Sequence, residues 1–314
     1  MPLKSLTRRD FIKINSSLLL ATTFPAFFFN KKYKPLLSFS TLGCPDWSFE
    51  KIVAFAGQNK YDGIEFRGIQ HEMDLTKCDA FSDKNLSSSI QLLKGKNLKV
   101  VNLGSSCMLH LPEGDERQKN LDEAKRFINL AQKLNCPYVR VFPNDFPDNQ
   151  TREQTIQLIV DGLKYLGEYA SDKIAAVLLE THGKVVYTKD LQIIMQQAQH
   201  PHVGLVWDAY NMWSVTKEPP AEVYASLKNY IRHTHIKDAR MVNGKEQYVL
   251  LGTGDSYIFE AIDILAKNKF PGYYSFEWEK LWLPEIAEPE IAIADYPKAM
   301  ERLLQKPPHV STLN

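Results

Sequence analysis

Eight short runs rich in β-branched, aromatic and other apolar residues recur along the chain from residue 36 onward, and each run predicts a β-strand. Longer segments between these runs place apolar residues three or four positions apart, which predicts helices. The segment FEKIVAFAGQ, for example, aligns Phe49, Ile52 and Val53 on one face. The predicted strands cover residues 36–43, 61–68, 98–104, 137–143, 175–183, 203–211, 230–238 and 272–280.

The alternation of strands and helices predicts the fold class. Residues 151–154, TREQ, form a capping-box pattern before an apolar helix, and Pro271 with Gly272 ends another helix before the last strand. Eight strand–helix repeats over about 270 residues predict an α/β fold, a single-domain (β/α)8 TIM barrel. A doubly wound open sheet is the alternative, but it usually has fewer strands, and no GxGxxG motif follows the first strand. We expect the barrel to occupy residues 35–306, followed by a C-terminal tail at 307–314.

The N-terminal segment has a different pattern. A basic stretch, TRRDFIK, precedes the apolar run SSLLLATTFPAFFF at residues 16–29, and this order is typical of a targeting signal. The apolar run is short for a membrane span, which needs about 20 residues. Arg8 and Arg9 resemble the arginine pair of the bacterial twin-arginine export signal. We therefore expect residues 1–34 to be a signal and linker, and the protein to be exported to the periplasm.

The fate of this signal is left open by the sequence. No clear A-x-A cleavage motif follows the apolar run. An uncleaved signal would anchor the protein to the membrane, and stable membrane insertion is expected only in that case. A disordered basic tail is the alternative interpretation of the same segment.

The balance of charge argues against nucleic acid and anionic membranes as partners. The chain carries 38 Lys and Arg residues against 37 Asp and Glu residues, so its formal net charge at pH 7 is +1. Because there is no basic surplus, binding to nucleic acid or to an anionic membrane surface is not expected. Assembly into a homo-oligomer is compatible with this composition.

Ionisable side chains stand at the C-terminal ends of the last four predicted strands, where TIM barrels carry their chemistry. These side chains are Glu180 on strand five, Asp208 on strand six, His235 on strand seven and Glu277 on strand eight. Converging carboxylates repel one another, and some would stay protonated unless a cation joins them. Three carboxylates and one imidazole suit one divalent metal ion, Mn²⁺, Mg²⁺ or Co²⁺, and Zn²⁺ is also compatible.

Predicted strands five to eight carry four motifs in order: LLETHG, VWDAYN, HTHIKD and SFEWEK. Together they resemble the xylose-isomerase-like TIM-barrel family, which is also called the sugar phosphate isomerase/epimerase family. The resemblance covers residues 36 to about 305. It implies that Glu180, Asp208, His235 and Glu277 bind one metal ion. It also implies that Glu180 and Glu277 are catalytic, flanking the substrate carbon and exchanging its proton.

The resemblance implies that the partner is a small-molecule sugar or keto-sugar. It also implies a first step common to the family's reactions, in which a proton is removed next to a ketone and the resulting enediolate is held by the metal. Return of the proton gives a sugar isomerase or epimerase, which we expect first. Expulsion of a group β to the carbonyl gives a lyase, by inosose-type dehydration or by β-elimination of a 3-keto-glycoside. A carbohydrate-binding barrel without catalysis is the second alternative, which the complete ligand set disfavours.

Further side chains near the predicted mouth are candidates for contact with the substrate. They are His182, Asn211, Lys237, Arg240, His110 and Glu65. Asn211 stands where the family's endonucleases and ketose 3-epimerases have a histidine, which disfavours both activities. Glu65 has an alternative structural role, as the partner of Arg67 or Arg140. His233 is expected to be a core histidine rather than a metal ligand.

Overall fold

The computed structural model describes residues 33–305 of the chain. The predicted C-terminal tail lies outside these residues, and so does the predicted signal and linker, apart from residues 33 and 34. No helix between residues 33 and 305 combines the length and the apolar composition that are needed to cross a membrane.

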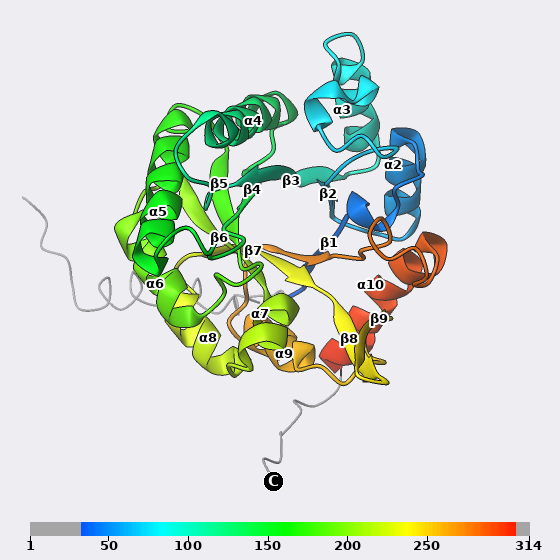
Figure 1. Cartoon of the computed structure of the whole chain (residues 1–314). Coiled ribbons are helices and arrows are strands. Elements are labelled where there is room, and N and C mark those ends of the chain that lie inside the picture. The colour runs from blue at the N-terminus through cyan, green and yellow to red at the C-terminus, as the bar shows by residue number, and fades with distance from the viewer. Residues whose placement is uncertain (1–32, 306–314) are drawn as a thin grey trace, which may run out of the picture. The chain divides into compact units, whose positions relative to one another are not determined.

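Eight parallel strands close into a barrel in the order β1-β10-β7-β6-β5-β4-β3-β2 (Figure 1). The predicted (β/α)8 barrel is therefore confirmed. Every barrel strand lies within its predicted range except β3, which continues beyond it. The strands are β1 (Leu36–Ser40), β2 (Gly63–Phe66), β3 (Lys99–Met108), β4 (Tyr138–Phe142), β5 (Ala176–Glu180), β6 (Val203–Asp208), β7 (Ile231–Ile236) and β10 (Tyr273–Phe276).

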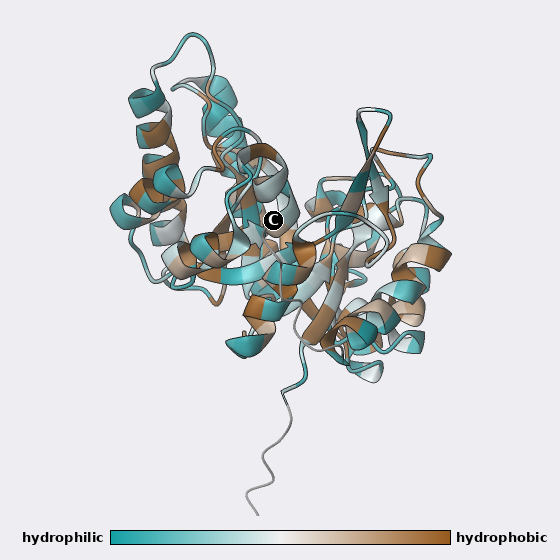
Figure 2. Ribbon diagram, turned by 90° about the horizontal axis from the view of Figure 1, so that it is seen from below, coloured by the Kyte–Doolittle hydropathy of each residue, from teal (hydrophilic) through white to brown (hydrophobic). Residues whose placement is uncertain are grey.

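Helices surround the barrel (Figure 1). Figure 2 shows hydrophilic and hydrophobic segments side by side along these helices, as expected for helices that are buried on one face only. The helices are α2 (Phe49–Gln58), α3 (Leu86–Gly95), α4 (Asp115–Leu134), α5 (Arg152–Tyr169), α6 (Thr188–Gln197), α7 (Ala209–Thr216), α8 (Pro220–Leu227), α9 (Ile258–Lys267) and α10 (Pro289–Gln305). Short 3-10 turns occur at Thr41–Gly43, Leu75–Lys77 and Asp79–Phe81.

The predicted capping box is present at the start of α5. The backbone N–H of Gln154 donates to the Thr151 hydroxyl at 3.2 Å, and the Thr151 backbone N–H donates to the Gln154 side chain at 2.8 Å. Two backbone N–H groups that the helix itself leaves unpaired are satisfied in this way.

The segment after β7 contains two strands that the apolar pattern does not predict. It forms an antiparallel hairpin of β8 (Asp238–Val242) and β9 (Lys245–Val249), which lies outside the barrel sheet. Six of its ten strand residues are exposed, and its apolar and polar residues do not alternate regularly, so no apolar face indicates these strands in the sequence. Asp238 fixes the end of the hairpin by accepting hydrogen bonds from the backbone N–H groups of Gly252 and Gly254.

The barrel interior changes in character along its axis. Towards the N-terminal ends of the strands, Ala176, Leu178 and Val206 form an apolar cluster against Tyr138. On the same strands two residues further on, ionisable side chains face the same interior, because side chains on one face of a strand recur with a period of two. The fold therefore places a layer of ionisable side chains nearer the C-terminal ends of the strands than this apolar cluster.

Candidate metal centre

Four side chains from four consecutive strands of the barrel meet at its C-terminal end. They are Glu180 at the end of β5, Asp208 at the end of β6, His235 in β7 and Glu277 directly after β10. Each offers one ligand atom, and these atoms all lie within 4.8 Å of one another. All four side chains are buried. We call this set the mouth cluster, and it consists of the four residues that the sequence predicts as metal ligands.

The mouth cluster is arranged around the Nδ1 atom of His235. One oxygen of each carboxylate faces this atom, at 3.4 Å for Glu180, 3.9 Å for Asp208 and 3.2 Å for Glu277. The Nδ1 atom is buried and has no hydrogen-bond partner among residues 33–305. Three carboxylate oxygens and one ring nitrogen therefore converge on one small volume.

The second oxygen of each glutamate is held by a cationic side chain. Arg140 Nε lies 3.0 Å from Glu180 Oε2, and both side chains are buried. Lys237 Nζ lies 2.6 Å from Glu277 Oε2. Because these contacts fix one oxygen of each carboxylate, the other oxygen is directed towards the centre of the cluster.

Asp208 is fixed by the local chain fold. It is the N-cap residue of α7, and its Oδ1 atom accepts the backbone N–H of Asn211 at 2.8 Å. Its own backbone N–H donates to the hydroxyl of Thr181 at the end of β5. An aspartate at a strand-to-helix junction can serve as a helix cap with one oxygen and as a ligand with the other.

Lys237 joins three carboxylates at the edge of the cluster. Its Nζ atom lies 2.9 Å from Asp208 Oδ2, 2.6 Å from Glu277 Oε2 and 2.6 Å from Glu279 Oε1. The lysine side chain is fully buried. Burial alone would lower its pKa, but these carboxylates outweigh burial and hold the pKa well above its ordinary value. Lys237 is therefore a permanent positive charge beside the cluster.

The carboxylates differ in how well their negative charge is tolerated. Burial would raise the pKa of Glu180, but Arg140 and His235 together outweigh it and the net shift is downward. Burial also opposes ionisation of Glu277, yet its cationic neighbours hold its pKa well below the usual range. For Asp208 burial prevails over Lys237, and the charge of Glu277 adds to it, so the pKa rises to about 7. The protein's own cations therefore do not keep all three carboxyls ionised.

This arrangement fits a divalent cation. Arg140 and Lys237 contact four carboxyl groups, those of Glu180, Asp208, Glu277 and Glu279. His235, whose pKa is raised, adds a third positive charge when it is protonated, so at most three cations face the four carboxyl groups. A bound dication would balance the excess negative charge and lower the pKa of the buried aspartate. A donor set of carboxylate oxygens with one imidazole suits Mg²⁺, Mn²⁺, Co²⁺ or Zn²⁺.

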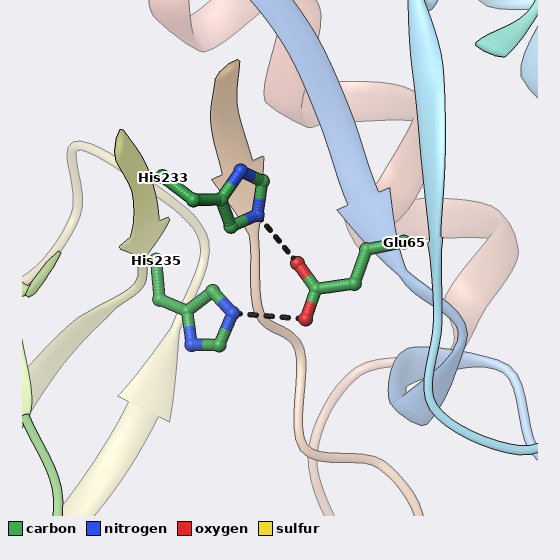
Figure 3. A group of neighbouring side chains, drawn as sticks. All are labelled: Glu65, His233 and His235. Carbon is green, nitrogen blue, oxygen red and sulfur yellow. Dashed lines mark hydrogen bonds and ion pairs between the residues drawn. The ribbon is translucent and has the colours of Figure 1, made fainter. Parts of the chain in front are cut away.

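A second buried polar group lies beneath the mouth cluster. Glu65 from β2 accepts hydrogen bonds from His233 Nε2 at 2.7 Å and His235 Nε2 at 2.9 Å (Figure 3). It also accepts one from Ser275 Oγ at 2.9 Å. Burial opposes ionisation of Glu65, but the two imidazoles outweigh it and its pKa is lowered. Burial would likewise lower the pKa of His235, but the charges of Glu277 and Glu65 hold it well above its ordinary value. We call Glu65, His233 and Ser275 the Glu65 network.

The Glu65 network bears on two expectations. Glu65 is fully buried and is hydrogen-bonded to Nε2 of His235, so the structure places it beneath the mouth cluster and not within it. Its predicted alternative partners, Arg67 and Arg140, lie elsewhere, because Arg140 pairs with Glu180. His233 is a buried, hydrogen-bonded core histidine, as expected.

Arg67 and Arg140 pack together over Gly104 of β3. A Cβ atom on this glycine would lie 2.6 Å from Arg67 Cδ and 2.9 Å from Arg140 Nη2, so a larger residue would displace both. Burial, and then the charge of Arg140, lower the pKa of Arg67 to about 9. Arg67 Nη2 donates to the Ser106 hydroxyl, whereas its Nη1 atom is buried without a hydrogen-bond partner in the described part of the chain.

His182 lies on the loop that follows β5. Its Nδ1 atom is 3.1 Å from Asn144 Oδ1, and its ring packs against Phe142 with 4.7 Å between centroids. The next residue, Gly183, has a φ of +71°, and a Cβ atom there would lie 2.2 Å from the Asn144 carbonyl oxygen. A glycine is required at this close approach. The loop after β4 thus fixes His182 in a half-buried position.

The other predicted contact residues have different surroundings. Asn211 is half-buried in the first turn of α7, beside Asp208. His110 is buried just after β3, and burial lowers its pKa. Arg240 is exposed on the β8–β9 hairpin, paired in register with Gln247, and the structure does not bring it into the mouth cluster.

Two charged residues of the site were not among the predicted site residues. Arg140 lies in the apolar strand YVRVF, where a lone buried arginine is itself a signal of an internal carboxylate partner. Glu279 follows Glu277 by two residues and bonds to Lys237. The sequence gives no comparable signal for Glu279, because exposed glutamates are common after strands.

Two curated proteins are similar to part of the chain. The 3-dehydroshikimate dehydratase of Bacillus anthracis is 24% identical over 194 residues, which cover 61% of this chain and 66% of that protein. The inosose dehydratase of Clostridium beijerinckii is 30% identical over 154 residues, which cover 44% of this chain and 51% of that protein. The chain thus spans less than two thirds of the length of either relative.

The barrel is also similar to solved structures. A crystal structure of the IOLI protein with a zinc atom superposes with a TM-score of 0.70 at 19% identity, over 85% of this chain and 97% of that one. The family model described as "Xylose isomerase-like TIM barrel" matches residues 53–303. The chain belongs to the xylose isomerase-like TIM barrel family.

Proposed function

We propose that this protein is a metal-dependent enzyme that removes a proton from the carbon next to the ketone of a sugar or cyclic keto-polyol and then releases a hydroxyl group as water. The observation that carries the proposal is the mouth cluster, in which three carboxylates and one imidazole converge at the C-terminal end of the barrel. No ligand of the set is missing, which argues against a barrel that only binds carbohydrate.

The chain's own residues supply the base. When bound, a divalent cation would polarise the ketone and stabilise negative charge on its oxygen. Glu180 and Glu277 each keep one oxygen on the inner side of the cluster. Their other oxygens are held by Arg140 and Lys237, which keep both groups ionised and able to accept a proton.

Loss of water is the outcome favoured by the sequence relatives. One carboxylate takes the proton, and the electron pair of the C–H bond moves into the ketone as an enolate. The enolate re-forms the carbonyl and expels the hydroxyl β to it, which leaves as water after gaining a proton. No oxidant or reductant is needed. The two similar curated proteins are both named as dehydratases.

Isomerisation or epimerisation is the second candidate, and one feature of the geometry favours it. Glu180 and Glu277 come from β5 and β10, which are separated in the barrel by β6 and β7. They therefore approach the cluster from two sides. One glutamate can take the proton and the other can return it, either to the opposite face of the same carbon or to the neighbouring carbon.

Export of the protein would limit which substrates it meets. The twin-arginine pattern at Arg8 and Arg9 supports a periplasmic location, where sugar phosphates are scarce, so we propose an unphosphorylated substrate. Changing both arginines to lysine should keep the protein in the cytoplasm on fractionation. Periplasmic recovery of that variant would contradict this route.

Proton NMR in D₂O with added Mg²⁺ tests the proposed reaction. The substrates are inososes, 3-dehydroshikimate, 3-keto-glycosides and free ketoses. We expect deuterium to enter next to the carbonyl of at least one substrate, with an unsaturated product as water is lost. A new epimer or isomer instead would establish the second candidate. No exchange and no product with any substrate would overturn the enzyme proposal and favour a binding protein.

A further inference from the structure

We infer that Glu65 is a positioning residue, which orients His235 so that Nδ1, and not Nε2, is its metal-binding atom. The inference rests on the proposed metal centre and extends it to the layer beneath. Glu65 itself contacts neither the centre of the mouth cluster nor the barrel mouth, because it lies on the far side of the His235 ring (Figure 3).

The first step concerns the two nitrogen atoms of the ring. His235 Nε2 lies 2.9 Å from Glu65 Oε1, and Figure 3 shows the second ring nitrogen on the side away from Glu65. An ionised carboxylate can only accept hydrogen bonds, so Nε2 must carry the proton. A neutral imidazole then has its lone pair on Nδ1, the atom that faces Glu180, Asp208 and Glu277.

The second step concerns what holds Glu65. Its other oxygen, Oε2, accepts from His233 Nε2 at 2.7 Å and from Ser275 Oγ at 2.9 Å. Both oxygens are therefore engaged by groups on β7 and β10, and the carboxylate plane is fixed. All of these side chains are completely buried, so water does not compete for the hydrogen bonds. A carboxylate held in this way restricts both the rotation and the tautomer of His235.

The third step is the rival interpretation of the same atoms. Glu65, His233 and His235 are close enough together to hold a metal ion of their own. That site would need Nε2 of both histidines without protons. The distances of 2.7 and 2.9 Å are those of N–H to carboxylate hydrogen bonds, which need a proton on each nitrogen. We therefore expect one metal ion per chain.

Two measurements on the full chain test the inference. Isothermal titration with Mn²⁺ should give one ion per wild-type chain and, for Glu65→Gln, an affinity weaker by about 10- to 100-fold, the usual cost of losing such a partner. Imidazole ¹⁵N NMR of the wild type loaded with Zn²⁺ should show metal binding through Nδ1 and a proton on Nε2. The NMR measurement needs no variant, so it decides the question even if Glu65→Gln fails to fold.

The outcomes separate the inference from the function it extends. Metal binding through Nε2, two ions per chain, or an unchanged affinity in folded Glu65→Gln would overturn the role of Glu65 and leave the metal-dependent enzyme standing. A wild-type chain that binds neither Mn²⁺ nor Zn²⁺ would overturn the metal centre and the inference together.

Discussion

The mouth cluster and the Glu65 network are two polar layers of one barrel interior. His235 of the mouth cluster joins them through its hydrogen bond to Glu65. In the Glu65 network one carboxylate meets two imidazoles and a hydroxyl, and both of its oxygens accept hydrogen bonds. In the mouth cluster three carboxylates face a single ring nitrogen. The carboxylate of the Glu65 network is fully hydrogen-bonded within the protein, whereas the cations beside the mouth cluster do not keep all three of its carboxyl groups ionised.

This difference separates a structural polar group from a functional one. Buried polar atoms normally find partners within the fold, and the Glu65 network follows this rule for its carboxylate. The mouth cluster departs from it at His235 Nδ1, which is buried without a hydrogen-bond partner in residues 33–305, and Nδ1 of His233 in the Glu65 network is in the same state. Burial alone is therefore no guide to function here. The informative property is that three carboxylates converge on one ring nitrogen that has no hydrogen-bond partner among the described residues.

The largest expected effect comes from removing a base of the mouth cluster. Glu277→Gln should slow deuterium exchange next to the ketone by about 10²–10⁴-fold, because a neutral amide cannot accept the proton. Circular dichroism should show an unchanged fold. Glu285→Gln, an exposed carboxylate on the loop after the same strand, is the matched control and should exchange at the wild-type rate. Near-normal exchange in Glu277→Gln would mean that this residue is not a base.

Removing Arg140, the cation that contacts Glu180 of the mouth cluster, should be the next largest effect. Arg140→Met leaves Glu180 as a buried charge without its partner, which costs about 3–5 kcal/mol of unfolding free energy. The exposed Lys51–Glu290 pair is the control, and Lys51→Met should cost about 0–1 kcal/mol. Urea unfolding in the presence of EDTA measures both. Equal costs for the two variants would contradict the importance of burial at Arg140.

Metal addition should sharpen the contrast between the layers. Mn²⁺ at about 100 times its dissociation constant should stabilise the wild type by about 2.7 kcal/mol, and EDTA should abolish this gain. Asp208→Asn keeps an oxygen that can cap α7 but removes a ligand charge. We expect this variant to be at least as stable as the wild type in EDTA and to gain little from Mn²⁺. A full metal-dependent gain in Asp208→Asn, measured by urea unfolding, would remove Asp208 from the ligand set.

The sequence predicts the mouth cluster better than the Glu65 network for a physical reason. Each residue of the mouth cluster lies at the end of a recognisable strand, and the (β/α)8 topology brings strand ends together without further information. The contact between Glu65 and His233 joins residues 168 positions apart, on β2 and β7. It depends on which side chains meet across the closed barrel, and strand periodicity does not specify this.

The same reasoning accounts for Arg140 and for the hairpin. The strand pattern correctly predicts that Arg140 lies in β4, but only the packed interior shows that it pairs with Glu180 and not with Glu65. The β8–β9 hairpin is exposed and rich in polar residues, so it lacks the apolar alternation by which the barrel strands are recognised. The barrel strands can be predicted because burial requires apolar residues along them. The hairpin that carries Arg240 is largely exposed, so its sequence is not constrained in this way.

The smallest expected effect comes from removing one hydrogen bond of the Glu65 network. Ser275→Ala removes the hydrogen bond from the hydroxyl to Glu65 Oε2 and should cost about 0.5–1.5 kcal/mol of unfolding free energy. Ser38, which pairs with Ser275 in the β1–β10 register, is the matched control. Its hydroxyl is buried without a hydrogen-bond partner in residues 33–305, so Ser38→Ala should be neutral or stabilising. Both variants should bind Mn²⁺ within about threefold of the wild type, because the bond between Glu65 Oε1 and His235 is left intact. A neutral Ser275→Ala together with a destabilising Ser38→Ala would show that the hydrogen bond from Ser275 does not stabilise the Glu65 network.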